Sequence, residues 1–119
     1  MTRDELIAGL EKATGPSVLL NMDLGSFAAT YFSDRSLAII RSGVCVGAPP
    51  YTSSRDAMLP GAGKLYWQIG QKRNRSWCAI CSTEPFGDNN IFNDTMQIGM
   101  ALTEPVARRI AELKALVKP

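Results

Sequence analysis

The feature that most constrains the fold is a pair of central segments in which side chains alternate in character. In residues 64–72, one set of side chains (Leu65, Trp67, Ile69) alternates with another (Tyr66, Gln68, Gly70), and in residues 76–83 Trp77, Ala79 and Cys81 alternate with Cys78, Ile80 and Ser82. Alternation with a period of two is typical of β-strands, because successive side chains point to opposite faces of a sheet. Residues 73–75 (Arg-Asn-Arg) separate the segments and are short enough to form a hairpin tip. The pattern predicts two antiparallel strands.

The first quarter of the chain has helical spacing instead. We expect a helix over residues 3–14. Thr2 and Glu5 have the spacing of a capping box at its start, and Gly15-Pro16, which cannot continue a helix, follow its end. Residues 17–31 carry apolar side chains at positions i, i+4, i+7, i+8 and i+11, which is one face of a helix. We expect two consecutive helices here.

The C-terminal segment also predicts a helix. Thr103 is a suitable N-cap, Glu104 complements the helix dipole, and Pro105 is tolerated in the first turn. The periodicity places one set of residues in a buried stripe and another outside it. The buried set is Val106, Ile110, Leu113 and Val117, and the outer set is Arg108, Arg109, Glu112 and Lys114.

The remaining segments are shorter. Residues 36–46 are rich in β-branched side chains and predict one or two strands, with a turn or bulge near Ser42-Gly43. Residues 51–56 offer several N-cap candidates for a short helix that Pro60-Gly61 would stop. Residues 84–94 read as a polar loop, and residues 96–102 as a further short strand.

Together these elements predict an α+β fold in which helices pack on one face of a small antiparallel sheet. The 119 residues are a common length for one domain, so we interpret residues 1–119 as a single domain. A chain of this length buries enough surface to fold without disulfides or a metal.

Composition excludes several functions. The chain has no histidine, which removes Ser-His-Asp and Cys-His catalysis and any metal site containing histidine. Its net charge of +2 is too small to argue for nucleic acid. It has no apolar run of the roughly 18 residues that a membrane span needs, and no signal-peptide pattern. We therefore expect a cytoplasmic protein with free cysteines, no membrane contact, no metal and no cofactor.

Two partial motifs fail on inspection. Cys78 and Cys81 match C-x-x-C, but in a strand they point to opposite faces, and a zinc site would lack a fourth ligand. Residues 61–64 (Gly-Ala-Gly-Lys) resemble the end of a phosphate-binding loop, but Leu59 and Leu65 occupy the positions where that motif needs Gly and Ser or Thr. Ordinary strand and turn roles explain both.

One candidate binding site lies at the predicted central helix. Backbone N–H groups at a helix start, together with hydroxyls and an arginine, can hold a phosphate or carboxylate. The alternative is simple helix capping, for which Ser and Thr are chosen in any case. The candidate ligand-binding residues are Tyr51, Thr52, Ser53, Ser54 and Arg55.

A second candidate site is the basic hairpin tip. Aromatic side chains beside cations can stack on a nucleotide and neutralise its charge. Tyr66 and Trp77 flank the same hairpin, and the alternative is a solvated tip above core tryptophans. The candidate binding residues are Trp67, Lys72, Arg73 and Arg75.

Three separate stretches resemble a family of small uncharacterised phage and prophage proteins of alphaproteobacteria. The family begins with a stretch like E-L-I-x-x-L-E-x-A-T-G-P-S, which residues 5–17 match, and carries a central Y-T-x-S-x-D-A, which residues 51–57 match. Its Pro-started, Ala-rich final helix is similar to residues 103–117. The resemblance covers about two-fifths of the chain and carries no catalytic residues. It implies a bacterial or phage cytoplasm and an accessory role.

By analogy with that setting, we expect a non-enzymatic binding protein that antagonises host defence. It could sequester an anionic nucleotide signal at the two candidate sites, as an oligomer with the ligand at a subunit seam. Alternatively it could cover a host immune protein, as anti-CRISPR proteins do, using residues 84–94 and the basic tip. The competing hypotheses are a small metal-dependent nuclease or nucleotide hydrolase, and a DNA-binding regulator.

Overall fold

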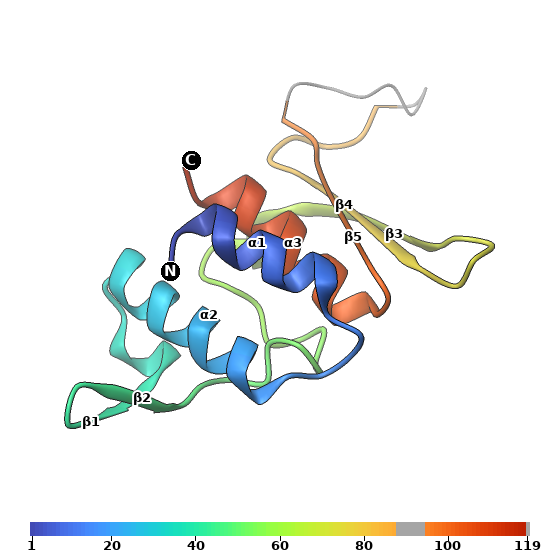
Figure 1. The fold of residues 1–119 in the computed structure, drawn as a ribbon. Coiled ribbons are helices and arrows are strands. Elements are labelled where there is room, and N and C mark those ends of the chain that lie inside the picture. The colour runs from blue at the N-terminus through green and yellow to red at the C-terminus, as the bar shows by residue number, and fades with distance from the viewer. Residues whose placement is uncertain (88–94, 119) are drawn as a thin grey trace.

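Three α-helices and two small antiparallel sheets make up residues 1–87 and 95–118, the part of the chain that the computed structural model describes (Figure 1). This confirms the predicted α+β class. The helices are α1 (Arg3–Lys12), α2 (Val18–Tyr31) and α3 (Glu104–Leu116). The strands are β1 (Ile39–Arg41), β2 (Val44–Gly47), β3 (Tyr66–Gln71), β4 (Trp77–Ser82) and β5 (Gln97–Ala101), with short 3-10 turns at Arg35–Leu37 and Ala62–Lys64.

The N-terminal helices form where their caps predict them. The hydroxyl of Thr2 accepts from the backbone N–H of Glu5 at 3.2 Å, and the Glu5 carboxylate accepts from the Thr2 N–H at 3.3 Å, which completes the capping box. At α2 the hydroxyl of Ser17 accepts from the N–H of Leu20 at 3.2 Å. Both predicted helices are confirmed.

The strands form two sheets, whereas one was expected. In the larger sheet β4 lies between β3 and β5, which confirms the hairpin over residues 72–76 and the strand within residues 96–102. Among the described residues, strands β1 and β2 form a sheet of their own, around a turn at Ser42 and Gly43. Both turn residues have positive φ values, of 49° and 78°, which is the geometry of tight hairpin turns.

The larger sheet has one covered face and one face that no described helix contacts. Helix α3 lies along β4 and β5, with α1 beside it on the same side (Figure 1). Gly99 of β5 permits this close approach, because a Cβ atom there would lie 2.1 Å from the carbonyl oxygen of Ala107. The buried core therefore sits between the inner face of the sheet and the helices.

Two sequence predictions are wrong. The central segment contains no helix: residues 51–61 form irregular turns that run along α3. In α3, Arg109 and Glu112 were expected outside, but both side chains are fully buried together with Ile110 and Leu113. Charged residues are rarely buried unless they are paired, and here they pair with each other.

Along the described part of the chain, every helix is too short or too polar to cross a bilayer. Cys45, Cys78 and Cys81 are free thiols.

The close packing at Gly99 yields a stability prediction. The Gly99→Ala substitution should lower the free energy of unfolding by about 1–3 kcal/mol, because the new methyl group collides with the backbone of α3. Gly70→Ala is the matched control, since Gly70 lies on the same sheet and its new methyl group would meet no atom within 4 Å. Urea denaturation of both variants measures the difference. Equal stability of the two variants would contradict the packing described.

Candidate functional site

The predicted anion-binding segment is mostly internal. The side chain of Tyr51 is fully buried and that of Thr52 is 1% exposed. The hydroxyl of Thr52 accepts from the backbone N–H of Ser17 at 2.8 Å and lies 2.8 Å from Oδ1 of Asn21. Thr52 thus fixes the start of α2 from a distant part of the chain and has no free hydroxyl for a ligand.

The backbone N–H groups of the segment are also engaged. The Thr52 N–H donates to Oδ1 of Asn21 at 2.8 Å, and the N–H groups of Ser53 and Ser54 donate to the carbonyl oxygen of Pro50 at 3.2 and 3.0 Å. Since no helix begins here, these amides do not converge on an outside anion. Of residues 51–55, only Ser53 and Arg55 are exposed to solvent. The Arg55 side chain is 65% exposed, and its Nε lies 3.9 Å from Oδ1 of Asp56.

A buried ion pair on α3 holds the next residues in place. Nη2 of Arg109 lies 3.2 Å from Oε2 of Glu112, and both side chains have no exposed surface. The same Nη2 donates to the carbonyl oxygen of Arg55 at 2.9 Å, while Oε1 of Glu112 accepts from the N–H of Leu59 at 2.9 Å. The pair thereby satisfies two backbone groups of the central segment that its local turn bonds leave over.

Burial dominates the ionisation of this cluster. It raises the pKa of Glu112 to about 7, against the opposing attraction of Arg109 and Arg108. Burial also lowers the pKa of Arg109 and raises the pKa values of Tyr51 and Cys81, which face the pair, to about 12. Glu112 is therefore the member of the cluster that titrates near neutral pH.

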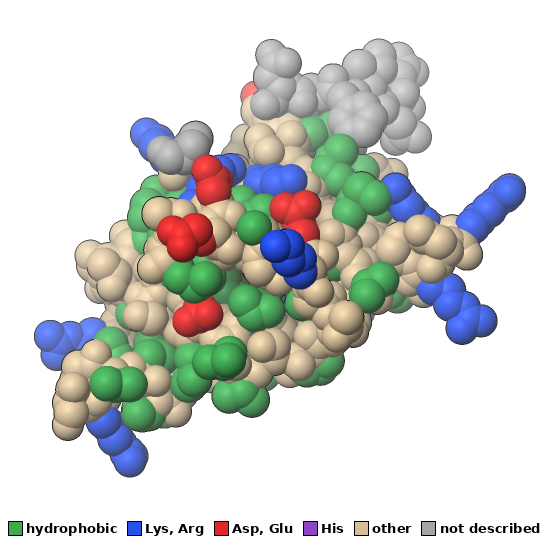
Figure 2. Space-filling view, viewed as in Figure 1, with side chains coloured by type: hydrophobic (Ala, Val, Ile, Leu, Met, Phe, Trp, Pro, Cys, Tyr) green, Lys and Arg blue, Asp and Glu red, His purple; other side chains and the backbone are tan. Residues whose placement is uncertain are grey.

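The predicted residues of the basic tip do not form one site. Lys72, Arg73 and Arg75 are exposed, and Figure 2 shows basic side chains projecting at this end of the molecule. Trp67 lies about 17 Å away along the strand. Its indole N–H donates to the carbonyl oxygen of Ala62 at 3.4 Å, and the guanidinium of Arg108 lies 5.2 Å from its ring centre. The ring faces the helices rather than the tip.

The opposite face of the sheet carries a set of apolar side chains that the sequence interpretation did not single out. Strand register places Tyr66, Ile80 and Ile98 on this face, with Tyr66 exposed by 46%. Lys72 reaches over its edge, with Nζ 3.6 Å from Sδ of Met100. We call this surface the open sheet face. By register it consists of Tyr66, Gln68, Gly70, Cys78, Ile80, Ser82, Ile98 and Met100, and of these Ser82 is fully buried.

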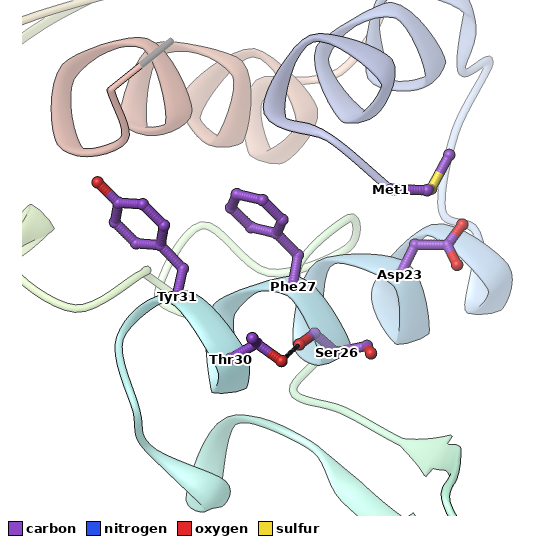
Figure 3. A pocket seen from close by; sticks show the side chains of 6 residues that line it. All are labelled: Met1, Asp23, Ser26, Phe27, Thr30 and Tyr31. Atoms are coloured by element: carbon purple, nitrogen blue, oxygen red, sulfur yellow. Dashed lines mark hydrogen bonds between the residues drawn. The ribbon is translucent and has the colours of Figure 1, made fainter.

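A shallow groove lies beside α2. A hollow of about 360 Å³ is lined by Phe27, Tyr31 and polar side chains of the same helix, with Met1 at its edge (Figure 3). The two rings stack in parallel at 5.7 Å, and the Tyr31 hydroxyl accepts from the backbone N–H of Lys118 at 3.3 Å. The rings pack on each other and hold the C-terminal segment, which is a structural role.

When compared with protein families, with curated proteins and with solved structures, the chain shows no match. The predicted loop over residues 84–94 lies partly outside the described residues, which resume at Thr95. Within the described ranges, no three His, Cys, Asp or Glu side chains come close enough together to hold a metal ion.

The internal role of Thr52 generates a prediction. Thr52→Val should lower the free energy of unfolding by about 1–3 kcal/mol, because the Ser17 N–H loses its buried acceptor. Thr52→Ser should retain most of the stability, and Ser53→Ala should change little because Ser53 is exposed. Thermal and urea denaturation compare the three. If Thr52→Val leaves the free energy of unfolding unchanged, this hydroxyl does not anchor α2.

The raised pKa of Glu112 predicts a pH dependence. The folded-state pKa of about 7 exceeds the ordinary value of 4.5, so the folded state binds the proton more tightly than the unfolded state. The contribution of Glu112 to stability is therefore complete below about pH 4.5 and is lost as the pH rises through 7, by an amount on the order of 3 kcal/mol. Few other groups titrate in this window because the chain has no histidine.

Urea denaturation between pH 5 and 8 tests this dependence against Glu112→Gln. The wild-type free energy of unfolding should fall across the window relative to that of the variant, which keeps an acceptor for the Leu59 N–H but does not titrate. Parallel pH profiles for the two proteins would show that Glu112 keeps an ordinary pKa.

Proposed function

We propose that this chain is a non-enzymatic binding protein that covers a protein partner with its open sheet face. The observation that carries the proposal is the set of apolar side chains on that face, next to three exposed cations at the hairpin tip. Apolar centres with polar or charged rims are typical of protein–protein interfaces. In the phage setting that the resemblance implies, the partner is a host immune protein, and the protein antagonises host defence.

The chemistry of the face favours a protein over a nucleotide. Tyr66 is its single aromatic residue, and Ile80, Ile98 and Met100 present aliphatic surface rather than rings on which bases could stack. The other candidate for an anion, residues 51–55, has its hydroxyl and amide groups engaged internally. Both observations support the protein-covering mode over nucleotide sequestration.

The charge around the open sheet face indicates the charge that the partner's surface should carry. Lys72, Arg73 and Arg75 form a basic rim at one end of the sheet. Complementary potentials mainly accelerate association and select the partner, while the apolar centre supplies affinity. A partner with an acidic rim around an apolar patch fits this arrangement. The absence of histidine from the sequence supports binding rather than turnover.

Affinity capture from the host followed by titration of the captured partner tests the proposal. Met100→Glu, at a site 44% exposed, should weaken binding by roughly 30-fold, because it places a negative charge on the apolar face beside the basic rim. Val18→Glu, at a 73% exposed position on α2, is the matched control and should bind like the wild type. Arg73→Glu should mainly slow association.

Three outcomes would contradict the proposal. Equal loss of binding in the Met100 and Val18 variants would place the interface elsewhere. A thermal shift with a nucleotide, unaffected by Met100→Glu, would favour sequestration. Turnover of a nucleic acid or nucleotide by the pure protein, abolished by a substitution in the chain itself, would establish an enzyme instead.

A further inference from the structure

Three fully buried polar side chains lie between the central segment and α3. Tyr51, Arg109 and Glu112 have no exposed surface. Arg109 and Glu112 form the ion pair at 3.2 Å, and Tyr51 is close enough to the pair that both charges act on its phenol. Burial raises the pKa of Tyr51 to about 12, while the charge of Arg109 lowers this pKa and that of Glu112 raises it. The three side chains therefore form one polar cluster inside the core.

Four atoms of this cluster make no hydrogen bond to any residue in the described ranges. They are Oη of Tyr51, Nε and Nη1 of Arg109, and Oε2 of Glu112, which takes part only in the ion pair. A guanidinium carries five N–H donors, and here only Nη2 donates, to the Arg55 carbonyl at 2.9 Å. On the carboxylate, Oε1 accepts from the Leu59 N–H at 2.9 Å. The cluster thus keeps donors on two side chains and an acceptor on the third.

Unpaired polar atoms are rare in protein interiors. Each one forfeits the hydrogen bonds that it made to water in the unfolded chain, and buried tyrosine hydroxyls in particular usually have a partner. Four unpaired atoms in one place would offset a large part of the free energy of unfolding of an ordinary domain. The cluster therefore points to a further ligand that both accepts and donates hydrogen bonds.

The chemistry of the cluster selects water as that ligand. The surrounding side chains have no exposed surface, so the ligand must be small. An anion would lie beside the Glu112 carboxylate and a cation beside the Arg109 guanidinium, so either ion would face a like charge. Water is neutral, accepts from a guanidinium or a phenol and donates to a carboxylate. A chain of this length holds about four buried water molecules, each with about three such bonds.

We propose that at least one internal water molecule bridges the Tyr51 hydroxyl to the pair of Arg109 and Glu112. The bridge joins the central segment to α3 through side chains, in addition to the two backbone hydrogen bonds that the pair makes. The cluster is thus a hydration site that belongs to the fold. This inference does not depend on the proposed function, because the site is internal and needs no partner protein.

Tyr51→Phe tests the bridge through the sign of its effect on stability. If the hydroxyl is bonded to water, its removal leaves that water one partner short, and the midpoint of thermal unfolding should fall by about 4 °C. If the hydroxyl is unpaired, its removal relieves a desolvation cost, and the midpoint should not fall. Tyr66→Phe, at a site 46% exposed, is the matched control and should unfold like the wild type. An unchanged or higher midpoint for Tyr51→Phe overturns the inference.

A high-resolution crystal structure of the full wild-type chain identifies the ligand. Density for a water molecule should lie within hydrogen-bond distance of Oη of Tyr51 and of a side-chain nitrogen of Arg109. A site without an ordered molecule overturns the inference, as does a bound ion or a direct hydrogen bond from Tyr51 to either member of the pair. This structure decides the question even if Tyr51→Phe fails to fold.

Discussion

The buried pair of Arg109 and Glu112 is the interaction on which the centre of the structure depends. Removing two charges from water costs several kcal/mol for each ion, and only good geometry and further hydrogen bonds offset that cost. Here the further bonds run to the Arg55 carbonyl and the Leu59 N–H, 54 and 53 residues away in the sequence, while Nε and Nη1 of Arg109 and Oε2 of Glu112 have no hydrogen-bond partner within the described residues. Loss of Glu112 would leave the charge of Arg109 uncompensated in the core, and loss of either partner would remove a hydrogen bond that holds the central segment on α3.

The same pair helps to hold the central segment, which is not a helix. Side chains of α3 and Asn21 of α2 satisfy three of its backbone groups, and local turn bonds satisfy the N–H groups of Ser53, Ser54, Ala57 and Met58. The segment that the sequence predicted as an anion-binding helix start links α2 to α3, and it leaves Ser53 and the Arg55 side chain exposed.

Periodicity predicted the parts of the fold that local physics determines. The caps of α1 and α2 and the hairpin between β3 and β4 depend on residues close in sequence, and all were confirmed. Arg109 and Glu112 were misplaced, because a helical pattern assigns charged side chains to the outside and cannot show a distant partner. Alternation likewise placed Tyr66 and Trp67 on opposite faces of the sheet, but it could not show which of the two faces the helices would cover.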